Sequence, residues 1–349
     1  MIETNGAQEL QFLIVMDAEA ADDQVEDVLA RLAEAGASGR VAPGRESTVI
    51  GAIGDHGLLG TLSLDGIAGV DRVQPVSKPY KLVSRETSPD STVIQVRGRR
   101  LGGRHFGLIM GPCTVESREQ TLATARAVHA AGSSMLRGGA FKPRTSPYSF
   151  RGLGTEALEI LAEAREETGL PVVTELLDPR HVELVAEMAD VIQIGARNMS
   201  NFLLLAEVGK TDRPVLLKRG PSSSVDELLM AAEYVVKEGN PRVILCERGI
   251  RTFESATRFT LDIGAVPVLK ERTHLPVIID PSHAAGRREL VPALARAAVA
   301  VGADGIIVEA HPQPEEAMCD APQLLRNADL TAFADDIRAH VALMDKEIG

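Results

Sequence analysis

The sequence predicts an α/β chain in which a (β/α)8 TIM barrel is preceded by a small ferredoxin-like α+β domain. Two observations lead to this prediction. From residue 105 onward, eight short apolar runs alternate with segments of helical periodicity, which is typical of a parallel barrel whose strands are buried on both faces. Before residue 85, the apolar pattern follows the order strand, helix, strand, strand, helix, strand, which is that of the ferredoxin-like unit.

The composition of the 349-residue chain is that of a globular protein with a large core, because 44% of its residues are hydrophobic and 25% are charged. A net charge of -12 argues against non-specific binding of nucleic acid or of an anionic membrane. No apolar run has membrane-spanning length, and the first residues, MIETNGAQELQ, are no signal peptide. The three cysteines are odd in number and far apart, so we expect no disulfide framework and a cytoplasmic protein.

Changes of pattern along the chain predict its domain boundaries. Residues 1–85 form the expected ferredoxin-like domain, which holds no cluster of catalytic residue types. Residues 86–104, which begin within the polar stretch SRETSPDST, are expected to link the domains and to close the barrel. Residues 105–349 form the expected barrel. The elements expected in the first domain cover residues 10–16, 22–36, 38–44, 48–54, 56–69 and 70–77.

The expected barrel strands are apolar runs that end in Gly, Pro or polar residues. They cover residues 105–112, 133–139, 170–176, 190–196, 213–220, 242–249, 275–283 and 304–312. Helical periodicity between and after them covers residues 117–131, 154–168, 179–189, 224–238 and 330–348. Pattern alone also allows an open, doubly wound sheet, although no Gly-rich dinucleotide-binding fingerprint follows the first strand.

Reactive or polar residues stand at the carboxyl end of every one of these eight runs. In chain order they are Cys113, Arg137, Glu175, Gln193, Lys218 with Arg219, Glu247 with Arg248, Asp280 with His283, and Glu309. The carboxyl ends of barrel strands meet at one rim, where the active sites of such barrels lie. A single polar residue at a strand end is often only solvated, but eight in register favour an active site.

Six cations belong to this rim, although the chain as a whole is acidic. They are Arg137, Lys142, Arg144, Lys218, Arg219 and Arg248. Arginine offers a planar fork to phosphate and carboxylate, and lysine a point charge. Six cations exceed the need of one phosphate, so we expect two phosphorylated substrates or one that is also a carboxylate. Some of the cations are expected instead to pair with Glu175, Glu247 or other nearby carboxylates.

A second set, formed by Cys113, His283, Glu309 and Asp320, mixes thiol, imidazole and carboxylate. This mixture suits a divalent transition ion such as Mn, Fe, Co or Zn. The spacing is irregular, and His283 could instead cap the following helix, but the residues follow strands that neighbour one another in a closed barrel. The other two cysteines are expected outside this set: Cys246 in the core, and Cys319 as a spectator or a redox partner of Cys113.

Several motifs together resemble the 3-deoxy-arabino-heptulosonate 7-phosphate (DAHP) synthase family, in its short-barrel type with an N-terminal ferredoxin-like domain. The motifs, spread over essentially the whole chain, are GPCTVES, LRGGAFKPRTSPYSF, IQIGARN, LLKRG, LCERGIRTFE, DPSHAAGRREL and GIIVEAHPQPEEAMCD. The resemblance implies a transferase, 3-deoxy-7-phosphoheptulonate synthase. Such an enzyme condenses phosphoenolpyruvate with erythrose 4-phosphate in the first step of the shikimate pathway, which leads to chorismate and the aromatic amino acids.

The resemblance also implies roles for individual residues. One divalent ion would be held by Cys113, His283, Glu309 and Asp320. Phosphoenolpyruvate would be contacted by Arg137, Lys142, Lys218 and Arg248, with Arg219 near its phosphate. The sugar phosphate would be held by Pro143, Arg144, Thr145 and Ser146. The residues expected to act in catalysis are Lys142, Cys113 and His283, and Glu175 is a candidate for activating water.

Regulation and assembly are implied by the resemblance alone: the first domain would bind tyrosine or phenylalanine, and the chain would form a homotetramer. Three other functions stay open. One is 3-deoxy-manno-octulosonate 8-phosphate synthase, which uses arabinose 5-phosphate and has Ala-Asn where this chain has Pro143 and Arg144. The second is a Schiff-base aldolase that uses Lys218. The third is a non-enzymatic amino-acid sensor.

Overall fold

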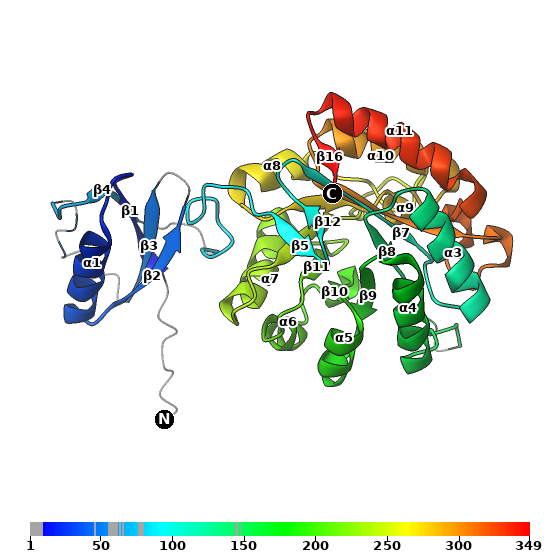
Figure 1. The fold of residues 1–349 in the computed structure, drawn as a ribbon, viewed down its shortest axis with the longest axis horizontal. Helices are drawn as coiled ribbons and strands as arrows, with labels where there is room; N and C mark the ends of the chain where they lie inside the picture. Colours follow the sequence, from blue (N-terminus) through cyan, green and yellow to red (C-terminus); the bar gives the residue numbers. More distant parts are fainter. Residues whose placement is uncertain are drawn as a thin grey trace. The chain divides into compact units, whose positions relative to one another are not determined.

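The structure, a computed structural model, describes residues 10–44, 47–54, 62, 64, 66–75, 80–143, 146 and 148–349. The chain divides into two compact units, one formed by residues 1–90 with 272–274 and the other by residues 91–271 with 275–349 (Figure 1). Each unit has a hydrophobic core of its own. No helix among the described residues is both long and apolar enough to cross a bilayer.

The smaller unit contains an antiparallel sheet with the strand order β2-β3-β1-β4. Its elements are β1 (Leu10–Met16), α1 (Asp22–Glu34), β2 (Ser38–Pro43), β3 (Thr48–Ile53) and β4 (Val70–Pro75). Because side chains alternate along a strand, Ile14 and Met16 pack with Val28 and Leu32 of α1. This confirms the predicted ferredoxin-like sheet. The helix predicted at residues 56–69 falls mostly outside the described residues.

The larger unit is a closed parallel barrel, as predicted, and not an open sheet. Among the described residues its eight strands are β7 (His105–Gly111), β8 (Met135–Arg137), β9 (Val172–Leu176), β10 (Val191–Ile194), β11 (Val215–Lys218), β12 (Val243–Glu247), β13 (Val277–Ile279) and β14 (Gly305–His311). Each strand pairs in parallel with the next, and β14 pairs with β7 to close the ring. Cys246 is fully buried in the barrel core, as expected.

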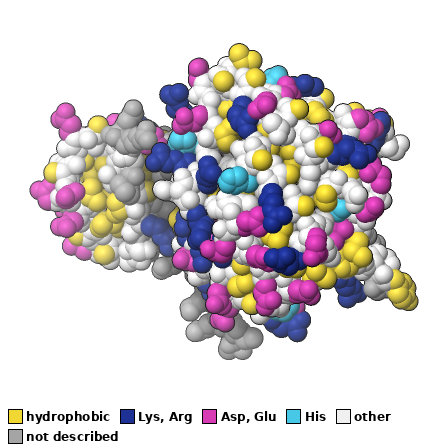
Figure 2. Space-filling view, turned by 45° about the vertical axis from the view of Figure 1, so that its right-hand side comes forward, with side chains coloured by type: hydrophobic (Ala, Val, Ile, Leu, Met, Phe, Trp, Pro, Cys, Tyr) yellow, Lys and Arg dark blue, Asp and Glu magenta, His cyan; other side chains and the backbone are white. Residues whose placement is uncertain are grey.

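Helices surround the strands of the barrel (Figure 1). The α-helices are α3 (Arg118–Ala130), α4 (Thr155–Thr168), α5 (Val182–Met188), α6 (Phe202–Gly209), α7 (Val225–Lys237), α8 (Ala265–Arg272), α9 (Pro281–Ala285), α10 (Val291–Ala300) and α11 (Leu330–Leu343). The 3-10 turns are η1 (Pro179–His181), η2 (Ala196–Asn198), η3 (Arg288–Leu290), η4 (Pro314–Glu316), η5 (Ala321–Gln323) and η6 (Asn327–Asp329). On the face in Figure 2, basic, acidic and apolar side chains of this unit are interspersed.

The last helix ends earlier than predicted. Its apolar periodicity extends to Met344, but α11 ends at Leu343, and Asp345 has a left-handed φ of 54° that reverses the chain. The following β16 (Glu347–Ile348) pairs with the start of β7, and β15 (Leu325–Arg326) pairs with the end of β14. Periodicity could not reveal the helix end, because the strand pairing that replaces the helix involves residues far away in the sequence.

A short hairpin closes the core of the barrel near the start of β7. It is formed by β5 (Ile94–Val96) and β6 (Arg99–Leu101), which lie in the segment expected to link the domains and close the barrel. Its buried side chains belong to the same core cluster as residues from all eight barrel strands. A Cβ atom on Gly107 of β7 would lie 2.4 Å from Cδ1 of Leu101, so glycine there makes room for this leucine.

Substitution of Leu101 by alanine is expected to destabilise the barrel by about 2–5 kcal/mol, because the fully buried side chain leaves a cavity in a tightly packed core. Urea denaturation monitored by circular dichroism measures this loss. The matched control is Val93→Ala beside the same hairpin, where the side chain is 46% exposed and a change within about 0.5 kcal/mol is expected. Equal effects of the two substitutions would contradict a plugging role for the hairpin.

Candidate active site

A cavity of about 310 Å³ lies among the carboxyl ends of the barrel strands. Its lining includes six residues expected to contact substrate: Arg137, Lys142, Pro143, Ser146, Lys218 and Arg248. Glu175 and Gln193, which stand at the ends of β9 and β10, also line it. The barrel therefore brings together side chains from Arg137 to Asp320, which are 183 positions apart in the sequence, because parallel strands all end at the same rim.

Three of the residues expected to contact substrate need separate comment. Arg144 and Thr145 lie outside the described residues. Arg219 does not belong to the cavity lining, because its guanidinium NH1 lies 2.8 Å from both Glu247 Oε2 and Asp262 Oδ2. The expectation that some cations pair with carboxylates such as Glu247 is confirmed here. Direct contact of Arg219 with a phosphate stays a prediction, and its pairing favours a supporting role.

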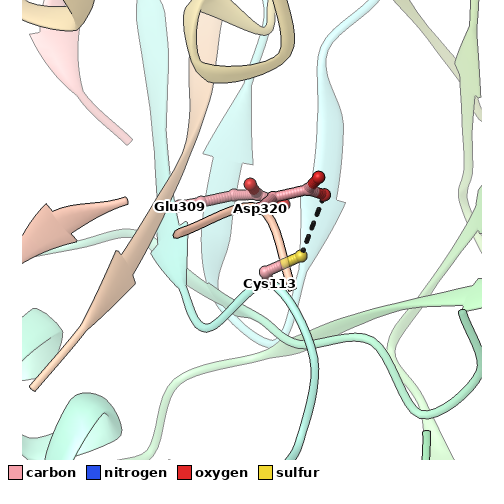
Figure 3. Close-up of side chains that lie close together, drawn as sticks. All are labelled: Cys113, Glu309 and Asp320. Carbon is pink, nitrogen blue, oxygen red and sulfur yellow. Dashed lines mark hydrogen bonds between the residues drawn. The ribbon is translucent and has the colours of Figure 1, made fainter. Parts of the chain in front are cut away.

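The expected metal ligands lie close together at one side of the cavity. The donor atoms of Cys113, Glu309 and Asp320 all lie within 4.8 Å of one another (Figure 3). Cys113 Sγ is 3.5 Å from Asp320 Oδ2, and His283 Nε2 is 3.5 Å from Glu309 Oε1. Cys113 follows β7, His283 lies on α9 after β13, Glu309 lies on β14, and Asp320 follows β14. Neighbouring strands thus supply a thiol, an imidazole and two carboxylates.

Protein cations balance this concentration of acidic groups. Lys142 Nζ lies 2.8 Å from Cys113 Sγ and 2.9 Å from Asp320 Oδ2, and Arg137 NH1 lies 2.6 Å from Glu309 Oε1. Burial opposes ionisation of Glu309, but the interaction with the His283 ring and the positive charges of Arg137 and Lys142 outweigh burial and lower its pKa to about 2. The carboxylate is therefore ionised at neutral pH and needs positive partners.

The protonation states of Cys113 and His283 also suit the binding of a divalent transition ion. A hydrogen bond with Cys319, burial and the charge of Glu309 raise the pKa of the Cys113 thiol, so only a strong positive partner can hold it as a thiolate. Burial lowers the pKa of His283, so its ring is neutral, as a ligand must be. Its Nδ1–H donates to Asp280 Oδ2 at 2.7 Å, which leaves Nε2 as the coordinating atom on the side of Glu309.

The same cavity also offers cations without carboxylate partners. Among the described residues, neither Arg197 nor Arg248 takes part in an ion pair, although both line the cavity. The Arg248 guanidinium lies over the ring of Phe259, 4.2 Å from its centroid. Arg248 is buried, and a buried cation without an anion is costly, so it indicates that an anionic ligand binds here, whereas Arg197 is exposed.

Some site residues were not predicted from the sequence. Arg197 lies in η2, directly after β10, within the motif IQIGARN that carries part of the family resemblance. Its place just beyond a strand end was the signal that could have identified it. Arg258 also lines the cavity, but it lies deep in the long loop between β12 and α8, where strand-end reasoning gives no signal.

Glu175 is the carboxylate most suited to exchange a proton in this cavity. Gln193 Nε2 donates to its Oε2 at 3.2 Å. Gly195 leaves it space, since a Cβ atom there would lie 1.9 Å from Glu175 Oε1. Burial raises its pKa, and the opposing charges of Lys142, Lys218 and Arg137 do not cancel that effect. Raised carboxyl pKa values are common in groups that act as acids or bases near neutral pH.

The raised pKa of Glu175 predicts a pH-dependent stability effect of Glu175→Gln. Wild type loses stability as the pH rises from the unfolded-state pKa of about 4.3 through the higher folded-state value, because the buried carboxyl resists ionisation. Glutamine does not ionise, so the melting temperature of the variant relative to wild type should rise between about pH 4 and pH 8. The exposed control Glu187→Gln should give a flat difference; a flat difference for Glu175→Gln would contradict the inferred burial effect.

Comparisons with known proteins agree with this geometry. Residues 91–342 match the DAHP synthetase I family, and residues 13–78 match the DAHP synthase ferredoxin-like domain. A phospho-2-dehydro-3-deoxyheptonate aldolase of Thermotoga maritima is 51% identical over 305 residues, which cover 87% of this chain and 89% of that protein. A 2-dehydro-3-deoxyphosphooctonate aldolase of Syntrophotalea carbinolica is 36% identical over 68% of this chain and 91% of that protein.

Solved structures extend the similarity to the fold. The crystal structure of the Thermotoga maritima phospho-2-dehydro-3-deoxyheptonate aldolase (DAHP synthase) matches with a TM-score of 0.77 and 44% identity, covering 98% of this chain and all of that one. A truncated form of the 3-deoxy-D-arabino-heptulosonate 7-phosphate synthase from the same organism matches 77% of this chain with a TM-score of 0.73 and 46% identity. With its barrel and its first domain both matched, the chain belongs to the DAHP synthetase I family.

Proposed function

We propose that this chain condenses phosphoenolpyruvate with erythrose 4-phosphate to form DAHP and phosphate, and that the reaction requires one divalent metal ion. The observation that carries the proposal is one cavity that brings together a metal-ligand set and two arginines which, among the described residues, have no carboxylate partner. Membership in the DAHP synthetase I family supports the choice of substrates. The reaction is the first step of the shikimate pathway.

The basic side of the cavity suits phosphoenolpyruvate, which carries a phosphate and a carboxylate. The proposed contacts are Arg137, Lys142, Lys218 and Arg248, and Arg197 is added to them from its place in the cavity. Arginine can bind each anionic group through two parallel hydrogen bonds, which fixes orientation as well as position. This orientation would direct the enol carbon toward the metal side of the cavity.

The loop after β8 suits the sugar phosphate. Pro143 and Ser146 line the cavity, and we assign Arg144 and Thr145 to the same task from the family motif KPRTS. Proline restricts the unbound loop, so less conformational entropy is lost when an anion orders it. The aldehyde end of erythrose 4-phosphate would then point toward Cys113, His283, Glu309 and Asp320.

The chemistry that a divalent ion would supply at these ligands is Lewis-acid polarisation of the sugar aldehyde; manganese, iron, cobalt and zinc all suit the set. The enol carbon attacks the aldehyde carbon, and Lys142 donates its proton to the developing alkoxide oxygen. The positive character left at the enol-ether carbon is captured by water, whose proton Glu175 accepts. The resulting phosphohemiketal loses phosphate to give the keto product. Cys113 and His283 serve as ligands in this scheme.

The rival functions are less well supported. The octulosonate 8-phosphate synthases have Ala-Asn where this chain has Pro143 and Arg144, and the octulosonate relative reported above is less similar than the heptonate one. For a Schiff-base aldolase, Lys218 would need to be a free amine, but its Nζ lies 2.5 Å from Asp280 Oδ2. This ion pair favours a binding role for Lys218. A purely sensory role does not explain why Cys113, Glu309 and Asp320 lie close enough together to bind a metal ion.

The test of the proposed function is release of phosphate from phosphoenolpyruvate, measured with erythrose 4-phosphate or arabinose 5-phosphate as acceptor. We expect turnover with erythrose 4-phosphate, loss of turnover after metal removal with a chelator, and partial recovery on addition of manganese, cobalt, iron or zinc. His283→Ala should lose both bound metal and activity, because it removes a ligand. Full activity of metal-stripped protein, or a preference for arabinose 5-phosphate, would contradict the proposal.

The first domain is proposed to regulate the barrel. Its match to the DAHP synthase ferredoxin-like domain supports binding of an aromatic end product, tyrosine or phenylalanine. Because exposed edges and faces of such sheets can pair between subunits, we place the effector where two of these domains meet, in a homotetramer. Inhibition then requires the effector to bind more tightly to an arrangement that blocks substrate entry.

Removal of the first domain is expected to leave catalysis intact and to abolish inhibition by tyrosine and phenylalanine. A chain that begins near Ser84 keeps every described residue that lines the cavity, and a truncated relative from Thermotoga maritima aligns with 77% of this chain. The measurement is the initial rate with and without each amino acid, for the full and the shortened chain. Inhibition that persists in the shortened chain would place the sensor in the barrel.

A further inference from the structure

The loop between β12 and α8, residues 248–264, is a hairpin that reaches over the metal side of the cavity. Ile250 and Thr260 exchange backbone hydrogen bonds of 2.8 and 3.0 Å across it. After its tip, the backbone N–H of Arg258 donates to Ala285 O at 3.1 Å, and that of Phe259 donates to Ala284 O at 3.0 Å. The returning half of the loop is thereby attached to α9, the helix that carries His283.

This attachment directs the Arg258 side chain toward Asp320. Gly286, directly after α9, has a left-handed φ of 66°, and a Cβ atom there would lie 2.4 Å from the Cβ of Arg258. Glycine at this position therefore lets the two chain segments approach. The Arg258 guanidinium NH1 then donates to Asp320 Oδ1 at 3.1 Å and to Gln323 Oε1 at 2.8 Å.

The two oxygens of Asp320 have different partners as a result. Oδ2 lies 2.9 Å from Lys142 Nζ and 3.5 Å from Cys113 Sγ, so it faces the other expected ligands. Oδ1 is held by Arg258 from the opposite side. Asp320 is also one of the few described residues other than glycine with a left-handed backbone, at φ 51°, a conformation that needs support from its surroundings.

Arg258 also reaches Glu309 through one intermediate. Gln323 is 1% exposed, and its Nε2 donates to Glu309 Oε2 at 2.6 Å. Since arginine can only donate, Gln323 must turn its oxygen toward Arg258 and its amino group toward Glu309. One guanidinium thus fixes the orientation of two carboxylates, Asp320 directly and Glu309 through the amide.

We infer that Arg258 is a positioning residue of the metal site, which holds Asp320 and, through Gln323, Glu309 in the orientation that presents their other oxygens to a divalent ion. The inference rests on the proposed metal dependence and goes beyond it. Partners that orient ligands in this way typically change metal affinity about 10- to 100-fold when removed. The side chain is 35% exposed and lines both the main cavity and a second cavity of about 370 Å³ that Ser255, Thr257 and Arg287 also line.

An effect of the Arg258 charge on metal affinity and an effect through ligand positioning would change that affinity in opposite directions. As a cation, Arg258 repels a divalent ion, so an effect of charge alone would make Arg258→Met bind metal more tightly and leave Arg258→Lys unchanged. Positioning predicts weaker binding in both variants. The lysine variant should be intermediate, because a single ammonium keeps the charge but reproduces only part of the contact with Asp320 and Gln323.

The experiment titrates the full-length, metal-stripped protein with Co²⁺ and follows the charge-transfer absorption of the cobalt–thiolate bond, with kcat and KM measured alongside. We expect the Kd for Co²⁺ to rise about 10- to 100-fold in Arg258→Met and less in Arg258→Lys. The KM for phosphoenolpyruvate at saturating metal should stay near the wild-type value. The matched control is Arg287→Met, which alters the same second cavity but, among the described residues, loses an ion pair only with the exposed Glu289, and its Kd should be unchanged.

Several outcomes would overturn the inference. Tighter or unchanged Co²⁺ binding in Arg258→Met would exclude positioning, and a raised KM with unchanged Kd would make Arg258 a direct substrate contact. If Arg258→Met does not fold, Gln323→Met tests the route to Glu309, and an unchanged Kd there overturns that route. Failure of wild type to bind Co²⁺ would overturn the proposed metal site itself, whereas wild-type binding with an unaffected Arg258→Met overturns only the role of Arg258.

Discussion

The site depends on one electrostatic constraint: several ionisable groups share a space from which most water is excluded, so each charge needs an opposite charge beside it. Three buried or nearly buried pairs meet this need: Arg137 with Glu309, Lys142 with Asp320, and Lys218 with Asp280. Removal of one partner from such a pair typically costs about 3–5 kcal/mol, because the other charge is left uncompensated. These pairs therefore preserve the geometry of the rim before any ligand arrives.

The same pairs explain how the cavity can accept both an ion and two anions. Lys142 lies where its ammonium balances Cys113 and Asp320, and a bound divalent ion would take over that balance. The lysine would then be available to the sugar. Arg197 and Arg248 lack carboxylate partners among the described residues, so substrate anions could bind them without breaking an internal pair. Such preorganisation reduces the reorganisation needed during the reaction.

Much of this site could be predicted from the sequence because, in a parallel barrel, residues at the carboxyl ends of the strands all lie at the same rim. Cys113, Glu175 and His283 each follow an apolar run, and closure of the barrel places those run ends at one rim. The position of a residue within a long loop cannot be predicted in this way. Arg258 reaches Asp320 only because backbone bonds attach its loop to α9, and neither apolar periodicity nor residue type reveals such bonds.

The direction of a side chain is likewise beyond what strand-end position determines. Lys218 and Arg219 are neighbours at the end of β11, yet Lys218 lines the cavity and Arg219 turns to Glu247 and Asp262. Successive residues of a strand point to opposite sides, so two adjacent cations rarely serve the same ligand. Local sequence pattern also fails to predict the end of α11. Met344 continues the apolar periodicity, but the helix ends before it, and β16 pairs with a strand far away in the sequence.

Asp280 connects the two halves of the site through a single oxygen. Its Oδ2 accepts from both Lys218 Nζ at 2.5 Å and His283 Nδ1 at 2.7 Å, and its Oδ1 caps the first turn of α9. An anion that draws Lys218 away leaves this oxygen to His283 alone, which strengthens the imidazole as a metal ligand. Because coupling between two binding events is reciprocal, a bound ion would in turn favour the anion. The carboxylate of Asp280 at the start of α9 would thus couple binding of the anion to binding of the metal ion.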